Sequence, residues 1–535
     1  MSETGFRVRY GIWLLLGTTL TGTTLAGCTV GPDFKRPQPY YAPTSYLNAP
    51  KPLAPVAASS SVPASEPVDA AWWGNFNDPL LTRLVERVAG ANLDVRVATI
   101  RLSESRASLG ITRAGAFPQL NANSSYTREQ QSKRGVIGLL GGGGASATPG
   151  TASNGLGGTQ GGVQNTTLTA PFDLYQYGFD ASYELDLWGR VRRNIEASKA
   201  QLAASEEDRR NTLTTAMAEV ARDYVQLRGD QANIAVVQRN LGTQRDSLKL
   251  TQERASAGLN TELDVANAAA QVAATEAQLP TLRAQAAQMV NAIALLLGAP
   301  PDAMDAELAA AEPIPPVLPV VPVGLPSELA RRRPDIRQAE ANLHAATATV
   351  GVAVADFFPK ITLSGSIAIQ ATQFKYLGSL GADTYSIGPS ITLPIFQGGR
   401  LTRTLELRRD QEQEAAISYQ RAVLNALHDV NNALTYYAAD QLQLEAISRA
   451  VAQNQRAVGL ASDQYRSGVV TFLDVLNAER QLLSTQQQQL QAQTSVSTDL
   501  VALYKALGGG WERSYPDDAP PPPAAVLIPA ALVEP

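Results

Sequence analysis

The chain repeats itself at a long offset, and this repeat limits the possible folds more than any other feature of its 535 residues. The segment Gly258–Ala268 matches Gly468–Ala478, which begins 210 residues later. Upstream, Phe117-Pro118 matches Phe358-Pro359 at an offset of 241, so the first copy carries 31 additional residues, the difference between the two offsets. Two copies of one supersecondary unit therefore build most of the fold.

Each copy predicts a β-hairpin, over residues 118–188 in the first copy and 359–396 in the second. Apolar and polar side chains alternate along the segments, most cleanly in Phe179, Ala181, Tyr183 and Leu185 against Asp180, Ser182, Glu184 and Asp186. A period of two indicates strands with one apolar and one polar face. The additional residues of the first copy include a Gly-rich stretch at 135–162, which is too polar and flexible to fold by itself.

Long helices follow both hairpins. The stretch between Gly189 and Gly258 contains no proline, and about 68 residues of helix span on the order of 100 Å. Apolar residues recur every seven positions in both copies: Leu213, Val220, Leu227, Ile234, Leu241 and Leu248, then Val423, Val430, Tyr437, Leu444, Val451 and Val458. Sustained heptads indicate supercoiled helices. Shorter return helices are expected at about 261–296 and 471–506.

These patterns divide the chain into six parts. They are a signal peptide at 1–27, a lipid-anchored N-terminal extension at 28–70, a first repeat at 71–298, an equatorial linker at 299–326, a second repeat at 327–508 and a Pro-rich disordered tail at 509–535.

The N-terminus predicts export from the cytoplasm. Arg7 and Arg9 precede an apolar stretch and the small-residue run Leu25-Ala26-Gly27, as in a secretory signal peptide. The next residue, Cys28, is the only cysteine, and Leu-Ala-Gly-Cys resembles the bacterial lipobox, in which the cysteine becomes the lipidated first residue. A chance cysteine in a signal peptide is the alternative. By resemblance to lipoprotein sorting rules, Thr29 favours the outer membrane.

Composition excludes several kinds of function. One Cys and two His, His344 and His428, leave little for metal or thiol chemistry, so we expect no enzyme and no cofactor apart from the lipid on Cys28. A net charge of −5 has the wrong sign for a nucleic-acid partner. No apolar stretch of 18 residues follows the N-terminus, so helices are not expected to cross a membrane.

The amphipathic strands leave two architectures open. A sheet with an apolar outside and a polar inside is typical of a membrane β-barrel, in which every strand edge is paired. Four strands are too few to close a barrel, so several copies must associate, or the strands form a soluble sandwich. In a barrel, Asp180, Glu184 and Asp186 would line water.

Several motifs in fixed order resemble the lipid-anchored outer membrane factors of tripartite efflux pumps, the TolC-like family, and within it the OprM/NodT-type lipoproteins. The motifs are Val30–Pro37 after Cys28, Trp72–Phe76, Asp78–Leu81, Asn92–Val95, Leu185–Arg190, Arg332–Ile336 and Leu393–Arg400. The resemblance covers residues 28–510.

This resemblance implies an α+β membrane protein. Three chains supply four strands each to a twelve-stranded outer-membrane barrel, and a long α-helical coiled-coil tunnel continues it into the periplasm of a Gram-negative bacterium. The implied function is an exit duct that exports drugs or other small toxic compounds. The implied partners are two further copies, outer-membrane lipid, a periplasmic adaptor (membrane fusion protein) and an inner-membrane transporter of the RND type.

The resemblance also implies two sites near the turns that follow the long helices. Adaptor contacts are expected at Gly258, Leu259, Thr261, Gly468, Val469 and Thr471, although a plain helical-hairpin turn explains the same residues. The expected gate residues are Asp474, Asn477, Tyr465 and Asp264.

Among the gate residues, Asp474 matches a ring of carboxylates, and Asn477 falls where some relatives carry a second acidic ring. Tyr465 matches a gate tyrosine, but Val470 replaces its basic partner, so we expect other hydrogen bonds to hold the closed state. Asp264 is the first-repeat counterpart of Asp474. The alternative is that both aspartates stabilise helix N-termini.

Two other functions remain open. The same architecture could serve type I protein secretion, against which the lipobox and the NodT-like motifs argue. A periplasmic adaptor also combines a coiled-coil hairpin with β domains, but it needs one long hairpin where this chain has two. An enzyme is a distant third.

Overall fold

The computed structural model describes residues 29–37, 62–64, 69–130, 171–316, 320–324, 326–379 and 381–517. The predicted signal peptide, Cys28, the Gly-rich stretch at 135–162 and the chain beyond residue 517 lie outside these residues. The chain divides into two units: Met1–Asp33, Gly110–Glu196 and Ala348–Arg408 form the first, and Phe34–Leu109, Ala197–Thr347 and Arg409–Pro535 the second. Within the described part, no helix combines the length and apolarity needed to cross a membrane.

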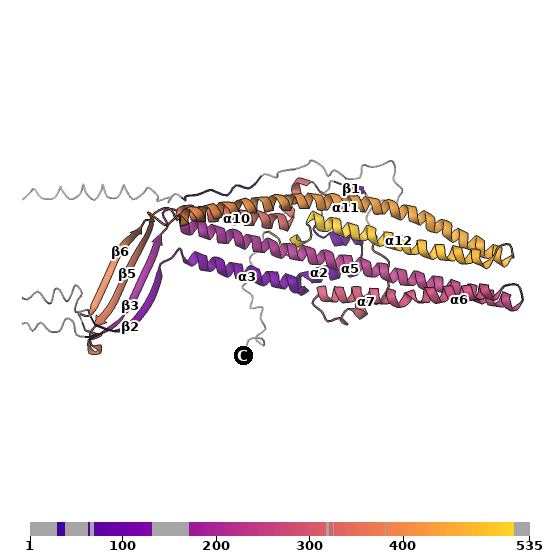
Figure 1. Cartoon of the computed structure of the whole chain (residues 1–535), viewed down its shortest axis with the longest axis horizontal. Helices are drawn as coiled ribbons and strands as arrows, with labels where there is room; N and C mark the ends of the chain where they lie inside the picture. The colour runs from indigo at the N-terminus through magenta and orange to yellow at the C-terminus, as the bar shows by residue number, and fades with distance from the viewer. Residues whose placement is uncertain are drawn as a thin grey trace, which may run out of the picture. The chain divides into compact units, whose positions relative to one another are not determined.

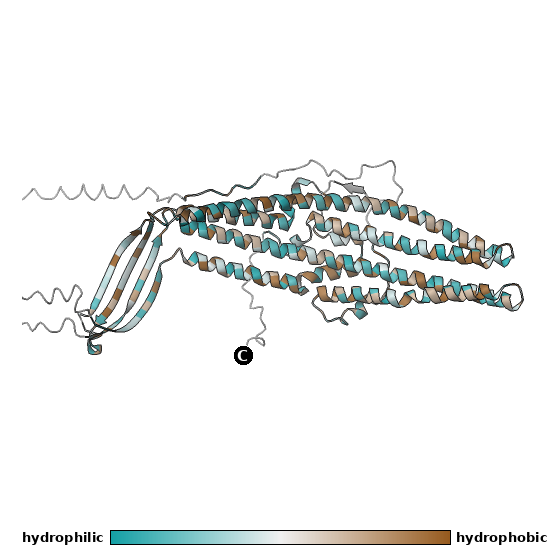
Figure 2. Ribbon diagram, in the orientation of Figure 1, coloured by the Kyte–Doolittle hydropathy of each residue, from teal (hydrophilic) through white to brown (hydrophobic). Residues whose placement is uncertain are grey.

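The first unit contains a four-stranded antiparallel sheet in the order β2-β3-β5-β6 (Figure 1). The strands are β2 (Gln119–Glu129), β3 (Phe172–Leu185), β5 (Lys360–Ala371) and β6 (Asp383–Thr392). They lie inside the two predicted hairpins, and polar and apolar residues are mixed along each of them (Figure 2). The β3–β5 pair joins the hairpins, whereas β2 and β6 each have a neighbouring strand on one side only among the residues that the structure describes.

The helices include two very long ones, α5 and α11, of 67 residues each. They are α2 (Pro79–Ala91), α3 (Leu93–Ala114), α5 (Arg190–Ser256), α6 (Glu262–Glu276), α7 (Gln278–Leu296), α8 (Asp305–Leu308), α9 (Leu329–Arg332), α10 (Pro334–Ala355), α11 (Arg400–Arg466) and α12 (Phe472–Leu507). We call α5, α6 and α7 the first helical hairpin, and α11 and α12 the second.

Short elements complete the fold. The segment β1 (Val62–Ala64), within the predicted N-terminal extension, pairs in parallel with β4 (Val320–Pro322) of the predicted linker. The 3-10 helices are η1 (Trp72–Phe76), η2 (Pro326–Glu328), η3 (Phe374–Tyr376) and η4 (Trp511–Arg513).

The first return helix, expected at about 261–296, is two helices instead. It is interrupted at Ala277, between α6 and α7. Pro280 accounts for the break, because proline has no amide hydrogen for the carbonyl of Glu276 four residues earlier. The counterpart of Pro280 in the second copy is Leu490, and α12 runs without interruption.

The predicted start of the disordered tail at 509 is wrong. Trp511 is buried, and the guanidinium groups of Arg210 and Arg337 lie 4.4 and 5.1 Å from the centroid of its ring. Asp517 forms ion pairs of 2.8 Å with the same two arginines. Cation–π contacts and ion pairs therefore hold residues 509–517 in the second unit.

The main apolar core of the second unit, which we call the Trp72 core, gathers residues from η1, α2, α5, α12 and η4. Trp72 stacks on Tyr504 with ring centroids 5.3 Å apart, and the Tyr504 hydroxyl accepts a hydrogen bond of 2.8 Å from Asn75. Further members include Trp73, Phe76, Leu81, Leu84, Leu213, Tyr224, Leu500, Leu503 and Trp511. These aromatic and aliphatic side chains give this core a large buried apolar surface.

Candidate functional site

The predicted adaptor-contact residues lie in two equivalent turns, one in each helical hairpin, at the same end of the helices (Figure 1). Gly258 and Gly468 have φ angles of 73° and 75°. Each turn is closed by the amide after the glycine, which donates to the carbonyl five residues earlier at 2.9 Å. This left-handed cap strains any residue with a Cβ, which explains the glycines.

The two predicted gate aspartates begin the return helices. The amides of Thr261 and Thr471 donate to Asp264 and Asp474 at 3.1 and 3.0 Å, and the threonine hydroxyls bond the same carboxylates at 2.9 and 2.7 Å. Both aspartates thus belong to capping boxes, the helix-stabilising alternative left open by the sequence. Asp474 and the nearby Asn477 are exposed, whereas Asp264 is half-buried.

Apolar side chains project into solvent around both turns. The four are Leu259, Leu263, Val469 and Leu473, with exposed fractions of 66%, 68%, 73% and 53%. Leu263 and Leu473 were not among the predicted contact residues, although they occupy the same place, the second residue, in α6 and α12. Exposed apolar clusters of this kind are typical of interaction surfaces.

Tyr465, the predicted gate tyrosine, is buried and connects the two hairpins. Its hydroxyl accepts a hydrogen bond of 2.6 Å from Asn260 and lies 3.4 Å from the Thr251 hydroxyl. The Arg254 guanidinium covers its ring at 4.9 Å and also donates to the Arg466 carbonyl at 3.3 Å. We call this cluster the Tyr465 contact. The sequence had not predicted that Asn260, Thr251 and Arg254 contact Tyr465.

A row of polar contacts, which we call the hairpin seam, continues from the Tyr465 contact along the two hairpins. Ser247 of α5 donates to Glu479 of α12 at 2.7 Å, and Asn240 donates to Gln486 at 2.8 Å. The next residue in each case contacts the return helices of the first hairpin: Arg480 donates to Gln271 of α6, and Gln487 to Gln278 of α7, at 2.5 and 3.2 Å. Paired amide, hydroxyl and carboxylate groups therefore span much of this interface.

Glu479 is the charged member of the seam with the least solvent contact, at 5% exposure. Burial raises the pKa of its carboxyl group, and the hydrogen bond from Ser247 opposes that rise. A group of this kind makes the seam sensitive to protonation.

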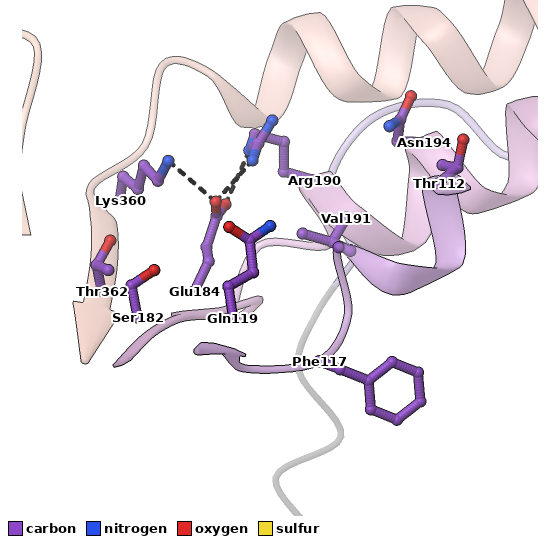
Figure 3. A pocket seen from close by; sticks show the side chains of 11 residues that line it. Thr112, Phe117, Gln119, Ser182, Glu184, Arg190, Val191, Asn194, Lys360 and Thr362 are labelled. Atoms are coloured by element: carbon purple, nitrogen blue, oxygen red, sulfur yellow. Dashed lines mark hydrogen bonds and ion pairs between the residues drawn. The ribbon is translucent and has the colours of Figure 1, made fainter. Parts of the chain in front are cut away.

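The first unit holds a polar pocket of about 270 Å³ at the base of the sheet. In its wall, Glu184 accepts hydrogen bonds of 2.8 and 2.6 Å from Arg190 and lies 3.0 Å from the Lys360 ammonium (Figure 3). The ion pairs tie the end of β3 to the starts of α5 and β5. Both carboxylate oxygens are occupied by cations, so this carboxylate is suited to holding the junction in place.

The described residues contain no group of three or more His, Cys, Asp or Glu side chains that could hold a metal ion. Of the two histidines, His344 stacks on Phe34 with ring centroids 4.3 Å apart.

A family model, relatives and a solved structure all match this chain, and all of them describe outer-membrane proteins. Residues 84–299 and 325–509 match the family described as outer membrane efflux protein. The chain is 33% identical over 500 residues to the probable efflux pump outer membrane protein TtgC of Pseudomonas putida, covering 93% of this chain and 96% of that protein. It is 29% identical over 488 residues to the probable outer membrane lipoprotein SilC of Salmonella typhimurium, covering 91% and 96%. The solved outer-membrane channel OprN superposes with a TM-score of 0.78 at 34% identity, covering 91% and 100%.

Proposed function

Because the chain belongs to the outer membrane efflux protein family, we propose that three copies of it form the outer-membrane exit duct of a tripartite efflux pump. The comparisons confirm the resemblance inferred from the sequence and its fold class. The observation that carries the assembly is the sheet, because in the described part of the chain β2 and β6 each have a strand on one side only. A strand edge cannot remain unpaired in lipid, so neighbouring copies must supply the partners.

Three copies would give twelve strands, enough for a water-filled barrel in which the polar faces line the channel. The long hairpins would then surround a tunnel on the periplasmic side. The soluble sandwich, the alternative left open by the sequence, does not explain why the edges of β2 and β6 are unpaired. A lone adaptor-type hairpin is also excluded, because the chain carries two hairpins and a shared sheet.

The duct is held in the outer membrane by its strands and, we propose, by lipid on Cys28. SilC, a relative over nearly the whole chain, is described as an outer membrane lipoprotein. Lipid chains add membrane affinity but do not replace the barrel. Cys28→Ala is therefore expected to remove lipid labelling while heat-stable trimers remain.

The gate of this duct is the end that carries the two turns. Opening requires the two hairpins to separate at this end. Separation breaks the hydrogen bonds of the Tyr465 contact and the stacking of a guanidinium on its ring. Three copies of the exposed Asp474 near one axis would attract cations and repel one another, so the ring favours cation passage and a wider tip. Asn477 weakens a second ring, because an amide carries no charge.

The exposed side chains at the turns, Leu259, Leu263, Val469 and Leu473, form the docking surface for the adaptor. Their apolar character suits the apolar tips of helical hairpins in the partner, and the six predicted turn residues position them. An inner-membrane transporter of the RND type would load the cargo. The duct performs no chemical transformation of that cargo.

The cargo class is small toxic compounds, by analogy with a relative named toluene efflux pump outer membrane protein TtgC. The test is deletion of the gene followed by a drug and solvent susceptibility panel. We expect increased susceptibility to several compounds, restored by the wild-type gene. Unchanged susceptibility together with loss of a secreted polypeptide would overturn efflux in favour of type I protein secretion.

A further inference from the structure

The interior of the first helical hairpin contains a glutamine whose amide group has no partner. Gln244 of α5 is 3% exposed, and neither its amide nitrogen nor its amide oxygen forms a hydrogen bond within the described part of the chain. It lies on the same face of α5 as Asn240 and Ser247, which both bond to α12. A buried amide without partners is costly, because it gives up its hydrogen bonds with water and gains none in exchange.

The second helical hairpin shows which bond a residue at this position can make. The repeat offset of 210 relates Gln244 to Asn454 of α11, and Thr275 of α6 to Thr485 of α12. The Asn454 amide donates to the Thr485 hydroxyl at 3.0 Å. The corresponding partner of the Gln244 amide is therefore the Thr275 hydroxyl.

Gln244 and Thr275 lie at the same level of the first hairpin. The residues that follow them, Arg245 of α5 and Glu276 of α6, are joined by a hydrogen bond of 3.3 Å. The two helices lie side by side here (Figure 1). A shift of one helix along the other therefore does not explain why the bond between Gln244 and Thr275 is missing.

Another residue occupies the Thr275 hydroxyl. Gln271, one turn earlier in α6, donates its amide group to this hydroxyl at 3.2 Å. The amide oxygen of Gln271 accepts a hydrogen bond of 2.5 Å from Arg480 of α12, in the second helical hairpin. An amide group is planar, so fixing its oxygen also fixes the direction of its nitrogen. Arg480 therefore holds Gln271 on the hydroxyl that Gln244 would otherwise use.

The second hairpin lacks this competition. The counterpart of Arg480 is Ala270, whose side chain forms no hydrogen bonds, and the counterpart of Gln271 is Gln481, which is exposed. The hydroxyl of Thr485 is therefore left to Asn454. The two hairpins differ because one of them receives an arginine from its neighbour.

We propose that Gln244, Gln271 and Thr275 form a two-state switch in the first hairpin, and that Arg480 of the second hairpin sets it. While the hairpins are together, Arg480 holds Gln271 on Thr275, and Gln244 is unpaired. When the hairpins separate at the gate, Arg480 leaves and Gln271 turns towards solvent. The Gln244 amide then bonds to Thr275, as Asn454 bonds to its threonine.

The switch lowers the cost of opening the duct, and it rests on the duct proposed above. Separation breaks the contact between Arg480 and Gln271, but it also ends the unpaired state of a buried amide. The bond gained inside the first hairpin offsets part of the bonds lost between the hairpins. Without Arg480, the switch would stay in its second state whether the hairpins are together or apart.

The first test removes the amide of Gln244 and keeps the length of the side chain. Gln244→Met deletes an unpaired polar group from the closed state and a hydrogen bond from the open state, so both effects favour closure. The frequency of opening in planar bilayers should fall on the order of tenfold. The midpoint of thermal unfolding of the purified trimer should rise by about 1–2 °C.

The counterpart in the second hairpin is the matched control. Asn454→Leu removes a hydrogen bond that is already made, so it should lower the unfolding midpoint. A midpoint of Gln244→Met that does not rise would overturn the unpaired state of Gln244, and with it the switch.

The second test asks whether Arg480 sets the switch. In an Arg480→Met background, Gln244 is already bonded to Thr275, so Gln244→Met should now lower the midpoint and leave the frequency of opening unchanged. The control background is Arg449→Met, because Arg449 is 72% exposed and pairs with Glu445 of its own helix. In that background Gln244→Met should still raise the midpoint.

An equal rise in the Arg480→Met background would overturn the switch and leave Arg480 as a simple contact between the hairpins. The unfolding midpoints test the switch without any channel recording. Absence of channel activity from the wild-type protein in planar bilayers would instead overturn the proposed duct, so the two failures can be told apart.

Discussion

The Trp72 core and the hairpin seam join the same two helices, α5 and α12, by different chemistry. In the core, Leu213 and Tyr224 of α5 and Leu500 of α12 are fully buried among aromatic and aliphatic side chains. In the seam, Ser247 and Asn240 of α5 hydrogen-bond to α12, and among the described residues two smaller apolar clusters accompany these bonds.

This difference predicts where the two helices can separate. Separating apolar surfaces costs roughly 25 cal/mol per Å², and contacts with water do not offset this cost. A hydrogen bond that is exchanged for one with water costs only about 1 kcal/mol. The Trp72 core should therefore remain closed while the seam opens, which puts the moving part of the duct at the turns.

The largest effect is expected from truncating the same residue type in the two regions of one helix. Leu500→Ala in the Trp72 core should lower the free energy of unfolding by about 3–5 kcal/mol, because it leaves a cavity in a large rigid core. Leu483→Ala in the small apolar cluster beside the seam should cost about 2 kcal/mol, because this cluster can collapse around the loss. Thermal unfolding of the purified trimers measures both, and equal losses would contradict the comparison.

Local patterns in the sequence were enough to predict the strands and the long helices. Alternation placed the strands inside 118–188 and 359–396, and heptads placed α5 and α11, because each pattern depends on residues only two to seven positions apart. The offsets even carry the strand register of the first hairpin over to the second.

Contacts between distant parts of the chain could not be predicted this way. Asn260 and Tyr465 are 205 residues apart, and their bond depends on how the two hairpins lie side by side. The break at Ala277 was predictable, since Pro280 is visible in the sequence. The burial of Trp511 was harder to predict. The signal was two aromatic residues, Trp511 and Tyr515, in a segment otherwise interpreted as a Pro-rich tail.

A moderate effect is expected at the Tyr465 contact. Tyr465→Phe keeps the ring under Arg254 but removes the hydroxyl that accepts from Asn260, which should cost the closed state about 1 kcal/mol, or roughly a fivefold shift towards opening. Higher single-channel conductance in planar bilayers measures this shift. Tyr436→Phe on the exposed face of α11 is the matched control and should leave conductance unchanged. Equal conductance of Tyr465→Phe and the wild type would remove Tyr465 from the gate.

A pH dependence is expected from Glu479. Burial raises the pKa of its carboxyl group above the ordinary value of 4.5 in the folded protein, so folding favours the protonated form. The seam should therefore be tightest below pH 4.5 and loosen as pH rises through the raised pKa. Glu479→Gln keeps an acceptor for Ser247 without a charge, so it should abolish this slope. Conductance recorded between pH 4 and 8 tests it, and a slope that persists in the variant would assign the titration to another group.

The smallest effect on stability is expected from charge removal at the turns. Asp474→Asn keeps a hydrogen-bond acceptor for Thr471, so the free energy of unfolding should change by no more than about 0.5–1 kcal/mol. Cation selectivity should nevertheless fall, because three charges are lost near one axis. Asp264→Asn has the same capping role and is the matched control. If reversal potentials in a salt gradient change equally for both variants, the ring is not formed by Asp474 alone. If neither changes, both aspartates only begin helices, and selectivity must arise elsewhere along the duct.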